Sequence, residues 1–213
     1  MREYEDVLRF WFGETPADTA DALFAKIKRW YSGGPDMDSA VRERFGSQVA
    51  DALAGGLETW EAEPRPRLAL VLILDQFTRN LYRGTARAYA ADARAQRLAV
   101  DAFDRHLTVD LGIEERNFFL MPLVHSEDLS LHDRAVVLMD QLVADAPPAL
   151  RPIWSMGVEQ SRKYRSVIAR FGRFPFRNQA LGRASTPEEE QFLATELANM
   201  PPAAMRDHVN PAR

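Results

Sequence analysis

The sequence contains no cysteine among its 213 residues. This absence excludes disulfide bonds, thiol catalysis and cysteine-ligated metals, and it suits the reducing cytosol. The chain also lacks a long apolar run, because its longest covers only residues 68–74 and ~20 residues are needed to span a bilayer. Residues 1–6 are too acidic for a signal peptide. We therefore expect a cytoplasmic protein without a membrane partner.

Signature motifs of common enzymes are missing as well. The sequence has no Walker loop, no G-x-G-x-x-G, no G-x-S-x-G and no H-E-x-x-H, which argues against common nucleotide enzymes and serine hydrolases. Basic residues alternate with aromatic ones between residues 161 and 183, a pattern superficially like a nucleic-acid surface. The whole chain has a formal net charge of −4 and no nucleic-acid-binding motif, so we expect no nucleic-acid partner.

Helical periodicity extends along most of the chain. Apolar residues recur at steps of three and four positions, as at Leu23, Ile27 and Trp30, and glycine or proline follows where the pattern ends. Thr186 and Glu189 form a capping box that announces the last helix. The pattern predicts helices over residues 23–31, 41–53, 67–82, 88–106, 117–124, 134–143 and 164–171, and one from residue 187 onward.

The predicted fold class is all-α. No segment shows apolar residues at every second position, and no Asn-Gly or Asp-Gly hairpin turn occurs. Short Gly- and Pro-containing loops between helices favour stacked antiparallel helical hairpins, in a solenoid-like or bundle architecture. We expect one helical domain over residues 1–200 and a poorly ordered C-terminal tail over residues 201–213.

The first candidate for chemistry is the charged segment that follows the longest apolar run. Asp75 and Arg79 stand four residues apart and can form an ion pair on one helix face, with Asn80 and Arg83 nearby. The simplest interpretation is a buried network that holds the helix to its neighbours. The functional interpretation is an anion site, because guanidinium groups bind carboxylate or phosphate in a bidentate manner.

The second candidate segment contains His125, Glu127 and Asp128. A histidine beside two carboxylates can supply a general acid and base, with Pro122 expected to kink or restart the preceding helix. On one uninterrupted helix, His125, Asp128 and His132 also have the spacing of a two-histidine, one-carboxylate metal site. Helix capping and salt bridging by the same residues is the favoured interpretation, and we expect no metal.

The third candidate segment contains Arg173, Arg177 and Asn178. Gly172 permits a left-handed helix end, and the following Phe174-Pro175 step forces the chain into an extended conformation. The sequence therefore indicates an ordered loop whose aromatic residues anchor it and whose arginines point back into a cleft.

The segments just described resemble those of the bacterial domain-of-unknown-function family 924. The resemblance rests on residues 75–80 with Arg83 and Gly84, and on residues 121–128, 172–178, 7–13 and 181–189. It implies an all-helical fold similar to tetratricopeptide-repeat proteins and no established activity. Thr78 stands where the family is expected to have proline, and Phe176 where histidine is common. His132 stands where glutamine is usual, and this departure weakens the metal interpretation.

Taken together, the sequence predicts that the three charged segments converge in one polar cleft. Its ligand-binding residues would be Asp75, Arg79, Asn80, Arg83, Arg173, Arg177 and Asn178, and its candidate catalytic residues His125, Glu127 and Asp128. Arginine is the majority cation, so a small anionic molecule or a peptide is the expected ligand, with no cofactor. Two alternatives remain open: an enzyme that uses His125 as general acid or base, and a structural scaffold for protein–protein interaction.

Overall fold

The computed structural model describes residues 3–200, and every regular element within that range is helical. The all-α prediction is therefore confirmed for the described residues, and the predicted tail over residues 201–213 lies outside them. The α-helices are α1 (Glu3–Phe12), α2 (Ala20–Ser32), α3 (Gly34–Leu53), α4 (Pro64–Val71), α5 (Thr78–Leu81), α6 (Asp92–Asp104), α7 (Ile113–Val124), α8 (Leu129–Asp145), α9 (Arg151–Phe171) and α10 (Pro187–Thr195). Short 3-10 segments are η1 (Glu58–Glu61), η3 (Ala86–Tyr89), η4 (Pro175–Arg177) and η5 (Leu197–Asn199), and η2 (Leu72–Phe77) is π-helical.

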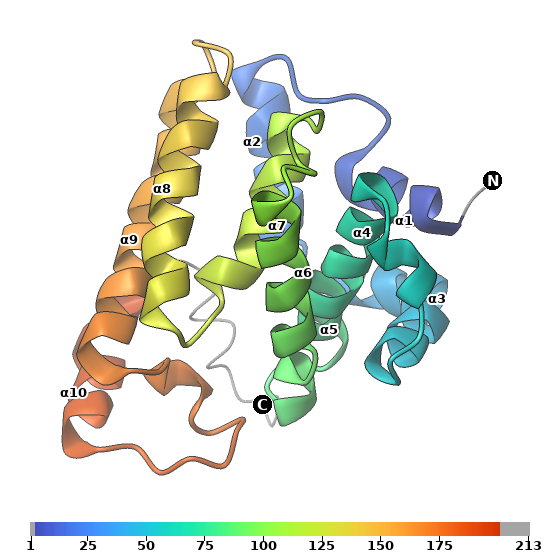
Figure 1. The fold of residues 1–213 in the computed structure, drawn as a ribbon. Helices are drawn as coiled ribbons and strands as arrows, with labels where there is room; N and C mark the ends of the chain where they lie inside the picture. The colour runs from blue at the N-terminus through green and yellow to red at the C-terminus, as the bar shows by residue number, and fades with distance from the viewer. Residues whose placement is uncertain (1–2, 201–213) are drawn as a thin grey trace.

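Helix α7 lies at the centre of the molecule (Figure 1). It packs against α4, α6, α8 and α9, and α8 and α9 form an antiparallel pair beside it. Helices α1 and α3 lie on the opposite side of α7 from that pair. Because α7 has neighbours on most sides, its residues are buried almost all round, as its apolar sequence predicts. Among residues 3–200, no helix is long and apolar enough to cross a membrane.

An aromatic cluster joins α7 to the N-terminal helices. The ring of Phe118 lies 5.3 Å from Trp11, 5.6 Å from Phe12 and 4.9 Å from Trp30, each in an edge-to-face arrangement. Burial of a large apolar side chain contributes about 1.5–3 kcal/mol, and each ring pair adds about 0.5–1.5 kcal/mol. This cluster fixes α1 and α2 against the helix that ends at His125.

Several predicted helix ends are confirmed and others shift. Thr186 caps α10 with the expected capping box, and Gly172 ends α9 in the left-handed conformation at φ 67°. The helix predicted over residues 88–106 begins only at residue 92, because the 3-10 segment η3 and a turn at residues 90–91 precede it. The helix predicted over residues 117–124 begins earlier, at residue 113, where Glu115 Oε2 accepts the N–H of Gly112 at 3.0 Å. Pro122 does not restart that helix, which runs on to its end two residues later.

Candidate functional site

The first charged segment lies where α4 passes through the π-helical turn η2 into α5. A π-helical turn is wider than an α-helical turn and is frequent at functional sites. Here it contains two consecutive polar residues that are both buried, Asp75 and Gln76. The Gln76 Nε2 atom donates to Asp75 Oδ2 at 2.6 Å, so one partner of the buried carboxylate comes from the same turn.

Asp75 forms its second interaction with His125, at the C-terminal end of α7. The His125 Nδ1 atom lies 2.8 Å from Asp75 Oδ1 and 3.0 Å from Oδ2, and Arg79 Nη1 lies 3.0 Å from Oδ1. Burial raises the pKa of the Asp75 carboxyl, but the charges of Arg79 and His125 outweigh burial and hold this pKa well below its usual range. The ionised carboxylate therefore accepts a hydrogen bond from His125 Nδ1, and Nε2 is the ring nitrogen outside this contact.

Two arginines complete the cluster around this pair. Arg79 donates to both carboxylate oxygens of Asp92, at 2.9 and 2.8 Å, in a bidentate arrangement. Arg177, from η4, donates to the His125 carbonyl at 2.9 Å and lies 3.7 Å from Asp92 Oδ2. Both guanidinium groups lie over the ring of Tyr89, at 5.4 and 4.8 Å from its centroid. The three charged segments therefore meet at His125, which contacts Asp75 of the first segment and Arg177 of the third.

Asn80 and Arg83 lie at the edge of this cluster and share a different carboxylate. Asn80 Nδ2 donates to Asp38 Oδ1 at 2.7 Å, and Arg83 Nη2 donates to the same oxygen at 2.9 Å. Asp38 belongs to α3, so this contact fixes the end of α5 against a neighbouring helix.

Glu127 and the loop that follows α9 form a second network. Arg183 donates to the two Glu127 oxygens at 2.7 and 2.9 Å, and the backbone N–H of Phe174 donates at 2.9 Å. Burial raises the pKa of Glu127, but the hydrogen bonds from Arg183 and Phe174 lower it below its ordinary value. Glu127 therefore holds the loop in place as a carboxylate acceptor.

Arg173 and Asn178 belong to the same loop and bind Glu189 of α10. Arg173 Nε donates to Glu189 Oε1 at 2.6 Å, and Asn178 Nδ2 lies 3.3 Å from Oε2. The hydrogen bond from Arg173 lowers the pKa of Glu189 to about 2, against the opposing effect of burial. Neither residue lines the pockets described below.

Asp128 and His132 do not form a metal site with His125. The chain leaves α7 after Val124, and Asp128 starts α8 as its N-cap, accepting the N–H of Ser130 at 2.8 Å. The single continuous helix that the metal geometry required is therefore absent at this point. His132 Nε2 instead lies 2.8 Å from the Ser126 carbonyl, and burial lowers the His132 pKa. No metal-ligating group of three His, Asp or Glu side chains occurs in the part of the chain that the structure describes.

Two adjoining pockets lie beside His125. The smaller, of about 40 Å³, is formed by α2, the η2–α5 segment, α9 and η4, and the larger, of about 300 Å³, by α2, α7, α8 and α9. They share the lining residues Trp30, Tyr31, His125 and Tyr164. Among the described residues that line either pocket there is no aspartate or glutamate, whereas the charged ones are Lys28, Arg79, Arg83 and Arg177.

The model of the bacterial family DUF924, whose members are described as bacterial proteins of unknown function, matches residues 7–196. The chain belongs to this family. The solved structure of ATU0120, a protein of unknown function from Agrobacterium tumefaciens, is similar to this DUF924 chain at 34% sequence identity, with a TM-score of 0.64. The similarity covers 81% of this chain and 97% of that one. Among curated proteins, none matches.

The matched region of this DUF924 chain includes all three charged segments. The structure brings Asp75, Arg79, His125 and Arg177 into one cluster, with Asn80 and Arg83 at its edge. Glu127, Arg173 and Asn178 lie in the neighbouring loop network, and Asp128 lies apart from both as a helix cap.

Several residues of the cluster were not predicted from the sequence of the DUF924 chain. The partners of the predicted arginines are Asp38, Asp92, Tyr89 and Glu189, and the aromatic pocket walls are Trp30, Tyr31 and Tyr164. Asp92 lies 13 residues from Arg79, and only the intervening turn η3 brings the two together. No local spacing signals such a contact, because it depends on how the chain folds back.

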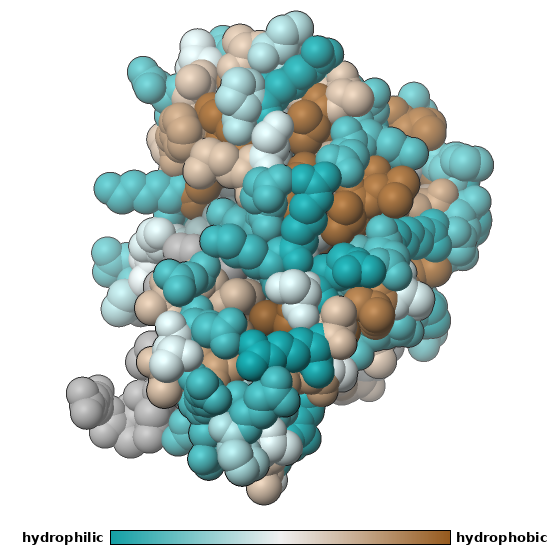
Figure 2. Space-filling view, turned by 90° about the vertical axis from the view of Figure 1, so that its left-hand side faces the viewer, coloured by the Kyte–Doolittle hydropathy of each residue, from teal (hydrophilic) through white to brown (hydrophobic). Residues whose placement is uncertain are grey.

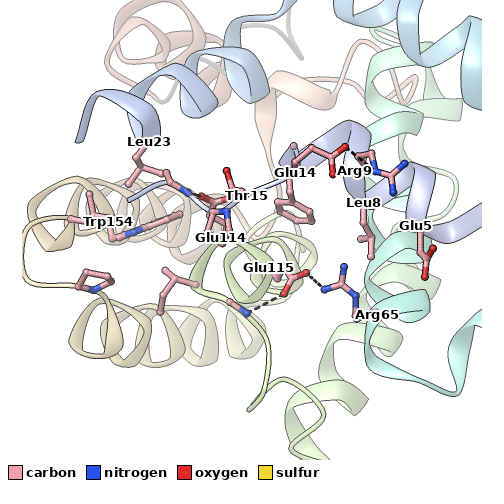
Figure 3. A pocket seen from close by; sticks show the side chains of 18 residues that line it. Glu5, Leu8, Arg9, Glu14, Thr15, Leu23, Arg65, Glu114, Glu115 and Trp154 are labelled. Atoms are coloured by element: carbon pink, nitrogen blue, oxygen red, sulfur yellow. Dashed lines mark hydrogen bonds and ion pairs between the residues drawn. The ribbon is translucent and has the colours of Figure 1, made fainter. Parts of the chain in front are cut away.

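A third pocket, of about 470 Å³, lies away from this cluster (Figure 3). It is formed by α1, the loop after it and the first residues of α7 and α9. Its charged walls include the paired Arg65 and Glu115, 2.6 Å apart, and the buried Glu114, which accepts Lys26 Nζ at 2.8 Å. None of the predicted site residues lines it.

Proposed function

We propose that this protein binds a small amphipathic anion in the two adjoining pockets. The apolar part of the ligand occupies the larger pocket, and its negative group faces the arginines of the smaller one. The observation that carries the proposal is the charge of the described lining residues, which include Lys28, Arg79, Arg83 and Arg177 and no carboxylate. Apolar walls with a few converging cationic groups are the usual composition of a site for such a molecule.

Carboxylates near the pockets also support this proposal, because they form ion pairs with the arginines that line the smaller pocket. Asp75 is 1% exposed and is a partner of Arg79, while Asp38 is the partner of Arg83. Such a partner fixes the direction of a guanidinium group before a ligand arrives, which lowers the entropy cost of binding. His125 lies at the junction of the pockets with Nε2 outside its contact with Asp75.

We also propose that the helices stack as repeated hairpins and that the protein is cytoplasmic. Successive packing of α6 on α7, α7 on α8, and α8 on α9 supports an arrangement similar to tetratricopeptide repeats, in which stacked hairpins offer a binding surface. The cysteine-free composition supports a cytoplasmic location.

Titration with decanoate, a ten-carbon carboxylate, tests the proposal, with decanamide as the uncharged control ligand. Decanoate at ~100 times its dissociation constant should add about 2.7 kcal/mol to the free energy of unfolding. Arg83→Gln removes one pocket cation and should weaken binding. Arg97→Gln is the matched control, because Arg97 is a largely exposed arginine on α6 that pairs with Glu61 outside both pockets.

Tighter binding of decanoate than of decanamide, weakened by Arg83→Gln and not by Arg97→Gln, would support the anion site. Equal binding of the two ligands, or equal effects of the two substitutions, would contradict it. The arginines would then have only the structural role of joining helices.

The Asp75–His125 pair favours a second candidate function, a hydrolase that acts on the bound molecule. In this proposal His125 Nε2 takes a proton from a water molecule as the water oxygen attacks a carbonyl carbon, and then returns it to the leaving group. Hydrolysis of 4-nitrophenyl decanoate is the assay. His125→Gln should lower the rate about 100-fold, whereas His106→Gln, at an exposed histidine outside the pockets, should not. A rate unchanged by His125→Gln would exclude this role.

A further inference from the structure

One face of α9 contributes a regular row of residues to the larger pocket: Trp154, Gly157, Ser161 and Tyr164. Their spacing of three, four and three positions places them along a single helix face. Ser161 is 1% exposed and Trp154 is 7% exposed. Within the described part of the chain, neither Ser161 Oγ nor Trp154 Nε1 has a hydrogen-bond partner. Ser161 lines this pocket alone, whereas Trp154 lines both this pocket and the one of about 470 Å³ beside α1. Unpartnered buried donors in a pocket wall are uncommon, because buried polar groups are nearly always hydrogen-bonded.

Gly157 lies between these two donors in the middle of α9. Apart from its chain neighbours and the backbone of its own helix, no atom of the described residues lies within 4 Å of the position that a Cβ atom would take there. Glycine inside a helix is less stable than alanine, so packing does not account for its presence at this position. Its effect on the pocket is to leave the helix backbone uncovered between Ser161 and Trp154.

The spacing of the donors along α9 matches an extended polypeptide. With a helical rise of about 1.5 Å per residue, Ser161 lies about 4.5 Å along the axis from Tyr164, and Trp154 about 10 Å further. An extended chain advances about 3.3–3.6 Å per residue, so three of its residues cover the distance between the donors. Tyr164 also lines the smaller pocket, which places the arginines at one end of this row.

We propose that the ligand is the C-terminal end of an apolar peptide, bound in an extended conformation along α9. This assignment rests on the proposed function and narrows its ligand class. The terminal carboxylate faces Arg79 and Arg83, and two backbone carbonyl oxygens accept from the Ser161 hydroxyl and the Trp154 indole N–H. A fatty acyl chain offers no acceptor at those positions, whereas a peptide offers one at every residue.

The first test compares an N-acetylated pentapeptide of alanine and leucine, with a free C-terminal carboxylate, against the same peptide with a C-terminal amide. Calorimetry with the full-length protein should show at least tenfold tighter binding of the acid, because the amide loses its charge-assisted contacts. Decanoate serves as the third probe, since it tests the proposed function without the peptide backbone.

The second test separates the backbone contacts from the carboxylate contact. Ser161→Ala should weaken peptide binding about fivefold and leave decanoate binding unchanged, because only the peptide has an acceptor for this hydroxyl. The substitution removes a donor that has no partner among residues 3–200, so the variant should remain folded. Ser166→Ala on the exposed side of α9 is the matched control. Gly157→Leu, which fills the pocket, should lower the binding of both peptide and decanoate at least tenfold.

The outcomes distinguish this inference from the proposed function. Peptide binding that depends on the carboxylate and on Ser161 supports both. Three results would overturn the peptide assignment but leave the anion site standing, provided that decanoate binds. They are equal binding of the two peptides, no binding of either peptide, and no effect of Ser161→Ala on peptide binding. Failure of both the peptide and decanoate to bind overturns both proposals. Peptide binding that survives Gly157→Leu places the peptide elsewhere and overturns the assignment.

Discussion

Asp75 is a carboxylate buried inside the protein whose charge is balanced by side chains rather than by water. Its interaction with Arg79 could be predicted from the sequence, because the two residues stand four apart on one helix. Its interaction with His125 could not, since that residue is 50 positions away and its approach depends on the packing of α7. The same limit applies to Asp92, the second carboxylate that Arg79 binds.

The first prediction concerns Arg79. Arg79→Met should lower the free energy of unfolding by about 3–5 kcal/mol, because Asp75 and Asp92 then remain in a poorly solvated place without their main cation. Urea unfolding at pH 7 measures the loss. The double variant Asp75→Asn/Arg79→Met should recover part of it, since the stranded charge of Asp75 is gone. A loss below about 1 kcal/mol in the single variant would show that the network does not stabilise the fold.

The second prediction concerns the acid sensitivity of Glu189. Its pKa is about 2 in the folded protein, below the ordinary value of 4.5, so its ionised form stabilises the fold above pH 4.5. This contribution is lost as the pH falls from 4.5 towards 2. Glu189→Gln keeps an acceptor for the capping box and removes the titrating charge. Between pH 6 and 3 the variant should lose less stability than the wild type, by roughly 1 kcal/mol after allowance for solvent screening of Arg173.

Thermal unfolding followed by circular dichroism across this pH range measures the difference. Glu190→Gln is the control, because Glu190 is the exposed neighbour on the same helix. Equal acid sensitivity of Glu189→Gln and Glu190→Gln would show that the contact with Arg173 does not set the stability at low pH.

At the scale of elements, local sequence signals predicted the helices well and their irregularities poorly. The capping box at Thr186 and the left-handed end at Gly172 depend on residues next to each other in the chain, and both are observed. The π-helical turn η2 was predicted only as ordinary helix within residues 67–82. An apolar pattern over so few residues does not distinguish a wider turn from an α-helical one, so the π-helical geometry was not predicted.

The third prediction concerns the stability of α9. Gly157→Ala should raise the free energy of unfolding by about 0.5–1 kcal/mol, because alanine favours the helix and its Cβ meets no described atom outside its own helix segment. Urea unfolding measures the gain. Gly46→Ala in α3 is the matched control, since Gly46 is also a helical glycine with open space at the Cβ position and should gain a similar amount. A loss of stability at Gly157 alone would mean that the added methyl group clashes and that the pocket is narrower than described.

At the scale of the whole molecule, the all-α class could be predicted because helical periodicity is local, whereas the pockets could not. The larger pocket takes its walls from α2, α7, α8 and α9, which are distant in sequence. The row of residues that α9 contributes to this pocket includes a tryptophan, a glycine and a serine, none of which is charged. Sequence reasoning directed at charged segments therefore located one end of the candidate site and overlooked the apolar remainder. On the face of the molecule that Figure 2 shows, apolar residues form several separate patches among polar side chains, mostly in the upper half of the view.

The fourth prediction concerns Phe118 and the attachment of the N-terminal helices to the rest of the molecule. This residue of the central helix contacts aromatic rings of α1 and α2, so its loss should weaken the attachment of the N-terminal helices to the rest. Phe118→Ala should lower the free energy of unfolding by about 3–5 kcal/mol. The matched control Phe24→Ala removes the same atoms at a position that is 46% exposed, and should cost less than about 1 kcal/mol.

The manner of unfolding of Phe118→Ala tests whether the helices form one cooperative unit. Two of the four tryptophans, Trp11 and Trp30, belong to the N-terminal cluster, so part of the tryptophan fluorescence reports on it, whereas circular dichroism reports on all helices. If the chain unfolds as one unit, the two signals should change at the same urea concentration in the wild type and at a lower common concentration in the variant. A fluorescence transition that precedes the loss of helix would show that α1 and α2 separate first. In that case α2, which contributes Trp30 and Tyr31 to both pockets, would be the element whose local opening exposes the candidate site.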